Sequence, residues 1–274
     1  MLRDILAVVE GGERATPAIG QALECARVFQ AHLNVTVVTE RMMLTAAFDP
    51  LGQSFPEPGI AEAHAAHLAA VRKLADQAPV DCEVRGICQE PLFIPGEADF
   101  QSRCSDLTII GAEPYWSDRR LRRRIVDAIL IDAAAPVLLS PADWKPQRIR
   151  HAVLGWNESA EASRAARVLR SLLEPGARID VVVGEPLYTP DGRSSSPGAA
   201  IVDHFARHRF EAELHVCRAG GRPMAETLES FSIDRGAQLL AVGAYAHTRL
   251  RELVLGGVTR EFMAFQRLPI LMVH

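Results

Sequence analysis

Residues 237–260 read AQLLAVGAYAHTRLRELVLGGVTR. An apolar run ends at Gly243, a polar connection follows, and Gly256-Gly257 precede a segment of helical character that begins near Thr259. Free backbone N–H groups at a helix N-terminus face an anion, and glycine lets the backbone come close to it. A strand, a loop and a glycine-rich helix start are therefore the parts that hold a phosphate chain.

A unit of this kind occurs twice in the chain. Short apolar runs recur in the same order in both halves, and such internal repetition predicts a tandem architecture. The matching pairs are residues 5–10 with 152–157, 81–84 with 211–214, 105–112 with 237–244, and 136–140 with 269–273. A polar stretch with two prolines, residues 141–147, marks the join. We expect domains at residues 1–142 and 148–274.

Each half alternates short apolar runs with longer amphipathic stretches. Runs such as Val181-Val182-Val183 are apolar on both faces, which is typical of a parallel sheet covered by helices on both sides. The expected strands are residues 4–9, 33–39, 81–86, 106–111, 136–140, 150–156, 178–183, 212–217, 238–243 and 269–273. The expected helices are residues 14–31, 60–77, 92–103, 119–134, 159–173, 197–209, 222–235 and 258–266. The pattern predicts an α/β fold of two doubly wound, parallel, five-stranded sheets of Rossmann-like type, with ligands at the carboxyl ends of the strands.

Composition narrows the class of protein. The net charge of -4 gives no reason to expect nucleic acid as a partner, and no apolar run approaches the roughly 20 residues that cross a bilayer. The N-terminal residues predict a first strand rather than a signal peptide. Five cysteines without a Cys-x-x-Cys pair indicate a reducing environment, so we expect a cytoplasmic protein.

On these residues the chain resembles the universal stress protein family in a tandem, two-domain form. Nucleotide-binding members of that family carry Gly-x-x-Gly, nine residues and then Gly-Ser/Thr after the fourth strand. Here the pattern reads Gly243-Ala244-Tyr245-Ala246, nine residues, and Gly256-Gly257, and Thr259 opens the next helix. The resemblance covers almost the whole chain. It implies an adenine-nucleotide α-hydrolase-like fold that holds ATP or a related adenine nucleotide, with or without Mg, in the C-terminal half.

Two positions depart from the family pattern. Ala246 stands where the second glycine is usual, and Gly257 stands where a hydroxyl usually meets a phosphate. Loss of one neutral hydrogen bond costs about 0.5–1.5 kcal/mol, which weakens such a site without abolishing it. Backbone donors would then carry nearly all the phosphate binding.

The resemblance also implies roles for residues outside the loop. Asn157 stands at the end of strand one, where an aspartate is usual, and Val183 at the end of strand two would lie beside the adenine. His247 could contact phosphate or ribose. The expected nucleotide-binding residues are Asn157, Val183, Gly243, Ala246, His247, Gly256, Gly257, Val258 and Thr259.

The first half has lost the phosphate pattern. Gly111 is followed by Ala112-Glu113-Pro114, and arginines at residues 119–124 replace the glycines. Pro114 lacks an N–H and arginine side chains are bulky, so we expect a degenerate nucleotide site there. Glu10 holds the strand-one carboxylate position. The arginines are expected to form a solvated helix start with salt bridges. Arginines in a first helical turn oppose the helix macrodipole, so a bound anion or an acidic partner is an open alternative.

Several other features have ordinary structural explanations. His64 and His67, like His204 and His208, have helical spacing, but no carboxylate or cysteine completes a zinc motif, so we expect surface or partly buried histidines. We expect the apolar insertion at residues 42–59 to cover the cleft of the first half, to make a subunit contact, or to form a buried loop.

The most consistent function is that of a universal stress protein that binds an adenine nucleotide and is not an enzyme beyond slow ATP hydrolysis. Its halves would form an intramolecular pseudo-dimer, and a homodimer is an option that the resemblance allows. The alternative is a nucleotide-free protein-interaction module. An adenylyl-transferring enzyme is a third possibility, which no motif supports, and a receiver domain is set aside because it needs clustered acidic residues at its strand ends.

Overall fold

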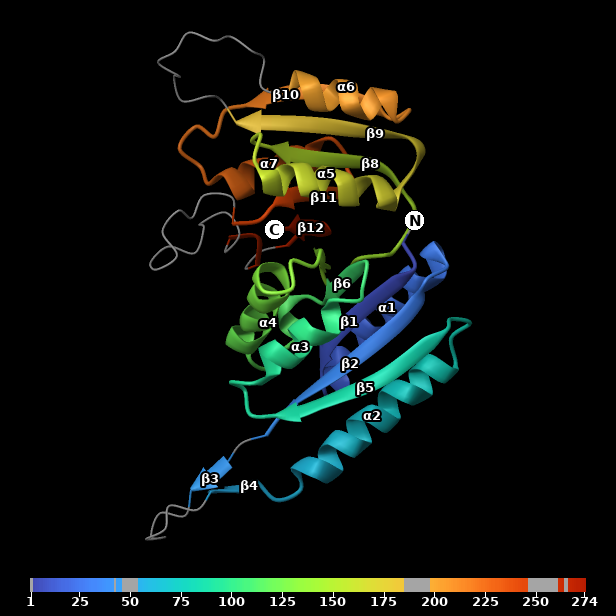
Figure 1. Ribbon diagram of the computed structural model, residues 1–274, viewed down its shortest axis with the longest axis vertical. Coiled ribbons are helices and arrows are strands. Elements are labelled where there is room, and N and C mark those ends of the chain that lie inside the picture. Colours follow the sequence, from blue (N-terminus) through green and yellow to red (C-terminus); the bar gives the residue numbers. More distant parts are fainter. Residues whose placement is uncertain (1, 42, 46–53, 185–197, 246–260, 264–265) are drawn as a thin grey trace. The chain divides into compact units, whose positions relative to one another are not determined.

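The computed structural model describes residues 2–41, 43–45, 54–184, 198–245, 261–263 and 266–274. The chain forms two compact units, residues 2–135 and residues 136–274. Each unit is an α/β layer structure with helices packed against a mostly parallel sheet (Figure 1). The α/β fold expected from the repeat is confirmed.

In the first unit four parallel strands lie in the order β5-β2-β1-β6. The helices α1 and α2 contact each other on one side of the sheet, and α3 and α4 contact each other on the opposite side. The order reverses beside β1, which is the switch point of a doubly wound sheet. The elements are β1 (Asp4–Glu10), η1 (Glu13–Ala15), α1 (Thr16–Phe29), β2 (His32–Glu40), β3 (Met43–Thr45), β4 (Ser54–Pro56), α2 (Ile60–Asp76), β5 (Cys82–Gln89), α3 (Ile94–Ser102), β6 (Leu107–Ile110), η2 (Glu113–Tyr115) and α4 (Arg119–Ile131).

In the second unit the strands lie in the order β7-β12-β11-β8-β9-β10. All neighbours are parallel except β7, which pairs antiparallel with β12 through Leu138 and Leu271. The switch point lies between β8 and β11. The elements are β7 (Val137–Leu139), β8 (Ile149–Trp156), α5 (Ala160–Leu172), β9 (Leu173–Gly184), α6 (Ala199–Arg207), β10 (Glu211–Cys217), α7 (Met224–Asp234), β11 (Leu239–Gly243) and β12 (Ile270–Val273).

The buried strands explain why the sequence pattern was informative. The three valines at residues 181–183 expose 3% or less of their surface, as expected for a strand covered on both faces. Edge strand β10 instead alternates between exposed and half-buried residues. Helix α5 begins at a serine N-cap, because the Ser159 hydroxyl accepts a hydrogen bond from the Ala162 N–H at 3.1 Å.

Two local predictions differ from the structure. Strand β9 begins at Leu173 rather than near residue 178, and the pairing of β8 with β9 shifts register between Ile149 and His151. Pro175 and Gly176 lie inside this irregular stretch. Both residue types are typical of turns, so the sequence pattern does not predict a strand there. In the insertion at residues 42–59, the described backbone forms an antiparallel pair between β3 and β4 rather than a simple loop.

The boundary between compact units also differs from the expected domain limits. Strand β7 falls in the second unit, because its ladder is made with β12. The sequence repeat places the same residues at the end of the first domain. The division of the chain at residues 142 and 148 therefore remains a prediction about the repeat, while the contacts divide it between Ala135 and Pro136.

Each half has one glycine at which a helix closely approaches the sheet. A Cβ on Gly111 would lie 2.8 Å from the Cβ of Ala18 in α1. A Cβ on Gly243 would lie 2.5 Å from the backbone nitrogen of Ala162 in α5. Both glycines come at the end of the fourth strand of their half, where the helix after the first strand begins. Close helix packing therefore requires glycine at both positions, whatever the site binds.

Gly111→Ala should lower the free energy of unfolding by about 1–3 kcal/mol, because the new methyl group meets packed atoms. The matched control is Gly20→Ala, since no atom lies within 4 Å of a Cβ at Gly20 and that residue lies inside α1. The control should raise stability by up to about 1 kcal/mol. Urea denaturation of both variants measures the difference, and equal effects would contradict the packing argument.

Candidate functional site

Three of the expected nucleotide-binding residues are described, and they lie at the carboxyl ends of adjacent strands. Val183 is near the end of β9, Asn157 follows β8, and Gly243 ends β11. These strands are neighbours in the order β9-β8-β11. Ala246, His247, Gly256, Gly257, Val258 and Thr259 lie outside the described residues, so their expected contacts stay predictions. The part of the site that can be described is its sheet edge.

Asn157 has an exposed side chain at this edge. Its Oδ1 accepts a hydrogen bond from the Ser159 N–H at 3.2 Å, which fixes the turn into α5. Its Nδ2 group has no hydrogen-bond partner among the described residues and is therefore available as a donor. Val183 is 3% exposed, so it would meet a ligand through its backbone and neighbouring residues rather than by an open side-chain surface.

Trp156 adds a donor that the sequence analysis did not identify. It ends β8 beside Asn157 and pairs in register with Val183. Its indole Nε1 is buried and finds no acceptor among the described residues. An unsatisfied buried donor costs about 1–3 kcal/mol, so an acceptor supplied by a ligand would relieve that cost.

The connection after β11 is tied to the end of the chain. The Ala244 N–H donates to the Val273 carbonyl at 2.8 Å, and His274 Nδ1 lies 3.1 Å from the Ala244 carbonyl. The rings of Tyr245 and His274 meet edge to face at 5.9 Å. Tyr245 has a φ of 61°, an uncommon left-handed conformation for a residue other than glycine. Strand β12 thus holds the first turn of the loop in place.

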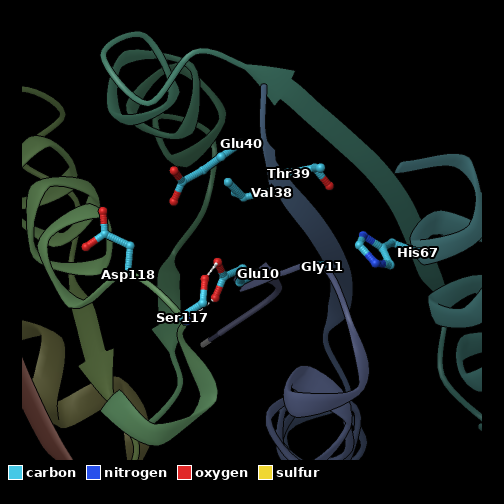
Figure 2. A pocket seen from close by; sticks show the side chains of 8 residues that line it. All are labelled: Glu10, Gly11, Val38, Thr39, Glu40, His67, Ser117 and Asp118. Atoms are coloured by element: carbon cyan, nitrogen blue, oxygen red, sulfur yellow. Dashed lines mark hydrogen bonds between the residues drawn. The ribbon is translucent and has the colours of Figure 1, made fainter. Parts of the chain in front are cut away.

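The corresponding edge of the first unit contains an acidic pocket of about 340 Å³. Figure 2 shows carboxylates and hydroxyls around it. The pocket lies where β1 and β2 end and α4 begins, which is the switch point of this unit. The lining residues are Glu10, Gly11, Val38, Thr39, Glu40, His67, Ser117 and Asp118.

Glu10 occupies the donors that would otherwise face a ligand. Its carboxylate accepts hydrogen bonds from both the backbone N–H and the hydroxyl of Ser117 (Figure 2). Asp118 caps α4, because its side chain accepts from the Arg120 N–H at 2.7 Å. Internal carboxylates therefore take the place that an anion would take at the start of this helix.

Glu40 is the third carboxylate of the pocket. Burial raises its pKa above the ordinary value, and the nearby charges of Asp118 and Glu10 raise it further. Negative potential of this kind opposes a phosphate. The pocket is consistent with the expected degenerate nucleotide site, although the sequence analysis singled out Glu10 alone among these acids.

Glu40→Gln should raise the thermal unfolding midpoint at pH 7. A carboxyl whose folded-state pKa is raised favours the folded state below its ordinary pKa of 4.5, and this contribution is lost as the pH rises through the folded-state pKa. The advantage of the variant should therefore shrink as the pH falls towards 4.5. Glu57→Gln, at an exposed position, should show no such gain in the same calorimetric series. A destabilised Glu40→Gln at pH 7 would contradict the electrostatic picture.

Two of the five arginines at the start of α4 form ion pairs. Arg119 pairs with Glu113 at 2.7 Å, and Arg123 lies 3.7 Å from Asp127. Arg122 differs from the expected solvated side chain, because it is 2% exposed and its Nε donates to the Gly111 carbonyl at 2.9 Å. Burial lowers its pKa to about 10. This arginine is a structural part of the connection after β6.

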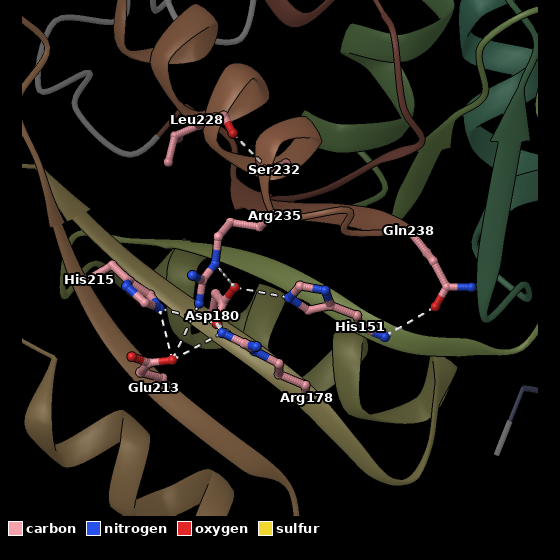
Figure 3. Close-up of polar contacts among 9 residues, drawn as sticks. All are labelled: His151, Arg178, Asp180, Glu213, His215, Leu228, Ser232, Arg235 and Gln238. Carbon is pink, nitrogen blue, oxygen red and sulfur yellow. Dashed lines mark hydrogen bonds and ion pairs between the residues drawn. The ribbon is translucent and has the colours of Figure 1, made fainter.

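A second polar cluster lies on the sheet of the C-terminal unit (Figure 3). Asp180 on β9 is fully buried and accepts hydrogen bonds from four side chains. The donors are Arg178 at 3.0 Å, His151 at 2.9 Å, His215 at 3.1 Å and Arg235 at 3.1 Å.

The ligand atoms of Asp180, Glu213 and His215 lie within 4.8 Å of one another, a spacing that could hold a metal ion. Guanidinium groups already bind both carboxylates, however, since Arg178 and Arg235 each contact Asp180 and Glu213. Burial disfavours the Asp180 charge, but hydrogen bonds from Arg235, His151, Arg178 and His215 outweigh it and hold the pKa well below its ordinary value. The cluster is a buried ion network that stabilises the fold.

Asp180→Ala should lower the free energy of unfolding by roughly 3 kcal/mol, because two guanidinium groups lose their buried partner. The contribution of Asp180 is present above the ordinary aspartate pKa of 3.8 and is lost as the pH falls towards the depressed folded-state pKa. Asp203→Ala, at an exposed position in the same unit, is the control. Urea denaturation at pH 7 compares the two variants, and an Asp180→Ala variant as stable as the control would refute the network.

The two doubly wound units in tandem define the class of this protein as a tandem Rossmann-like α/β protein. Its sequence is 26% identical over 148 residues to Universal stress protein Slr1230 of Synechocystis sp.. The match covers 53% of this chain and about half, 49%, of that relative. No family model matches the chain.

Solved structures match over nearly the full length of the chain. A universal stress protein from Archaeoglobus fulgidus has a TM-score of 0.66 at 13% identity, covering 98% of this chain and 95% of that chain. A putative universal stress protein from Pseudomonas aeruginosa has a TM-score of 0.61 at 16% identity, covering 99% and 93%. The structural matches establish the fold. With the sequence match they confirm the resemblance to the universal stress proteins.

None of the helices in the described part of the chain is both long and apolar enough to cross a membrane.

Proposed function

We propose that this protein is a nucleotide-linked stress-response protein that holds one adenine nucleotide, ATP or a close relative, in its C-terminal half. The proposal rests on the glycine pattern from Gly243 to Thr259 and on the strand ends that precede it. A cytoplasmic location and binding without fast hydrolysis are parts of the same proposal.

The observation that carries the proposal is the difference in charge between the two switch points. In the first unit, Glu10 and Glu40 end the first two strands and Asp118 begins α4. In the second unit, Asn157 and Gly184 stand at the corresponding strand ends and carry no charge. A triphosphate carries several negative charges, so strand ends without carboxylates suit it better than an acidic pocket does.

The described donors suit the nucleoside end of such a ligand. The Asn157 Nδ2 group could donate to a ribose hydroxyl, and the buried Trp156 Nε1 could donate to an acceptor on the base or sugar. The backbone beside Val183 would offer hydrogen bonds to adenine. Mg²⁺ would arrive with ATP and keep phosphate and water oxygens as most of its ligands.

Gly257→Glu should weaken ATP binding at least tenfold. The glutamate side chain would keep the backbone away from the phosphates and would place a negative charge beside them. Calorimetric titration with Mg-ATP should give one site per chain for the natural sequence. Gly20→Glu adds the same charge at an open, exposed position in the first unit and should leave the affinity unchanged. Absence of heat and of a thermal shift at millimolar Mg-ATP would overturn the nucleotide proposal, and ATP binding unchanged by Gly257→Glu would overturn the assignment to this loop.

A nucleotide-free interaction module is the second candidate, and one observation favours it. Leu92, Phe93 and Phe100 are 68%, 55% and 69% exposed around α3, so the first unit presents apolar side chains together to its surroundings. If the ATP titration fails, this apolar group becomes the better starting point for the function.

A further inference from the structure

The ends of α5 and α6 bring together a cluster of cationic and imidazole side chains. Arg170 lies in the last turn of α5, and His204, Arg207 and His208 lie at the end of α6. The Arg170 Nη1 is 3.0 Å from His204 Nε2 and 2.9 Å from His208 Nε2. The two imidazole rings are 4.7 Å apart, centroid to centroid. We call Arg167, Arg170, His204, Arg207 and His208 the α5–α6 cluster.

Both imidazole rings accept hydrogen bonds from Arg170. A guanidinium group only donates, so each ring accepts through its Nε2. Arg170 is thus held by two imidazole acceptors rather than by a carboxylate. Its positive charge is not compensated by any acid among the described residues.

The other arginines of the α5–α6 cluster are in the same position. Arg167 and Arg207 are exposed, and neither forms an ion pair with a described residue. By contrast, five arginines elsewhere in this unit each pair with a carboxylate: Arg150, Arg164, Arg178, Arg235 and Arg267. The α5–α6 cluster therefore contains three arginines without a carboxylate partner among the described residues.

Cations at the ends of two helices partly complement the helix macrodipoles, which is the simplest reason for their presence. That effect needs about one cation per helix end, whereas this cluster has three arginines and two histidines. Burial and then the charges of His208, Arg170, Arg207 and Arg167 lower the pKa of His204, so every charged group that acts on this ring is cationic. Glu174, four residues after Arg170, pairs with Arg150, and Asp203 and Glu211 form no ion pair with the cluster among the described residues.

We propose that the α5–α6 cluster is a binding site for a small phosphate anion with several charges, such as tripolyphosphate. Guanidinium groups match phosphate oxygens in a forked geometry. Two imidazole nitrogens lie within 3.0 Å of one guanidinium nitrogen, and so compact a site suits a small polyanion better than an extended nucleic-acid strand. The site lies on helix ends rather than at the strand ends where the nucleotide is proposed.

Lower pH strengthens this site through His204. Burial and the neighbouring cations lower the pKa of His204 in the free protein, and a bound polyanion opposes that shift. Protonation of His204 and anion binding therefore favour each other, because the imidazolium no longer accepts at Nε2 and adds a positive charge beside the phosphate.

The test is calorimetric titration with sodium tripolyphosphate at low salt, at pH 6 and pH 8. It is carried out in the Gly257→Glu background, so that the proposed nucleotide loop does not contribute. Arg170→Gln and Arg207→Gln should each weaken binding about tenfold at pH 6, because each removes a charge-assisted contact. Arg222→Gln removes the same charge at another exposed position of the unit and should leave the affinity unchanged.

The double variant His204→Gln/His208→Gln separates the role of the histidines from that of the arginines. Glutamine keeps an acceptor for Arg170 but cannot gain a proton, so this variant should bind at pH 8 like the parent and lose the increase at pH 6. Histidine NMR signals of rings 204 and 208 should shift on titration, while that of His32 in the first unit should not.

Three outcomes would overturn the proposal: no binding at millimolar tripolyphosphate and pH 6, equal binding by Arg170→Gln and Arg222→Gln, or equally tight binding of hexaglutamate. The last result would assign the cluster to acidic peptides instead of phosphates.

Discussion

Both halves depend on the contact between the start of a helix and a glycine at the end of the fourth strand. At Gly111 the partner is Ala18, and at Gly243 it is the backbone of Ala162. These contacts join the first and fourth strands of each half, which are the strands on either side of the switch point. A side chain there would push the helix away and change the opening at which a ligand can bind. Packing therefore requires the glycine that also forms part of a phosphate-binding pattern. This requirement explains why the first half has Gly111 without the rest of that pattern.

On this shared backbone the two halves differ in the charge at their strand ends. The first unit fills its own switch point, because Glu10 binds Ser117 and the charge of Glu40 adds to that of Asp118. In the second unit, no described residue accepts a hydrogen bond from the Asn157 amide or the Trp156 indole. The difference in charge between the halves thus follows from a few residues at strand ends, without any change in strand order. Loss of binding in one half would leave the fold intact, since the packing glycine is kept.

The sequence predicted most of the fold, because the order of buried strands and amphipathic helices is a local signal that repeats. It did not predict that β7 belongs to the second unit, since the partner of a short apolar strand is not encoded in that strand alone. The start of β9 was missed because Pro175 and Gly176 have the chemistry of a turn. For the candidate nucleotide site, the sequence pattern predicted the residues at the strand ends. It missed Trp156 and the approach of Glu40 to Asp118, which depend on segments brought together by folding.

Histidines of the C-terminal unit act in two opposite senses. Around Asp180, His151 and His215 donate to a buried carboxylate that two guanidinium groups also contact. Around Arg170, His204 and His208 accept from a guanidinium that has no carboxylate partner among the described residues. The first network therefore neutralises its charges internally, whereas the second presents a positive charge to an anion. Because the two networks lie on separate elements, the sheet core can remain folded while α5 and α6 exchange their mutual contacts for an external anion.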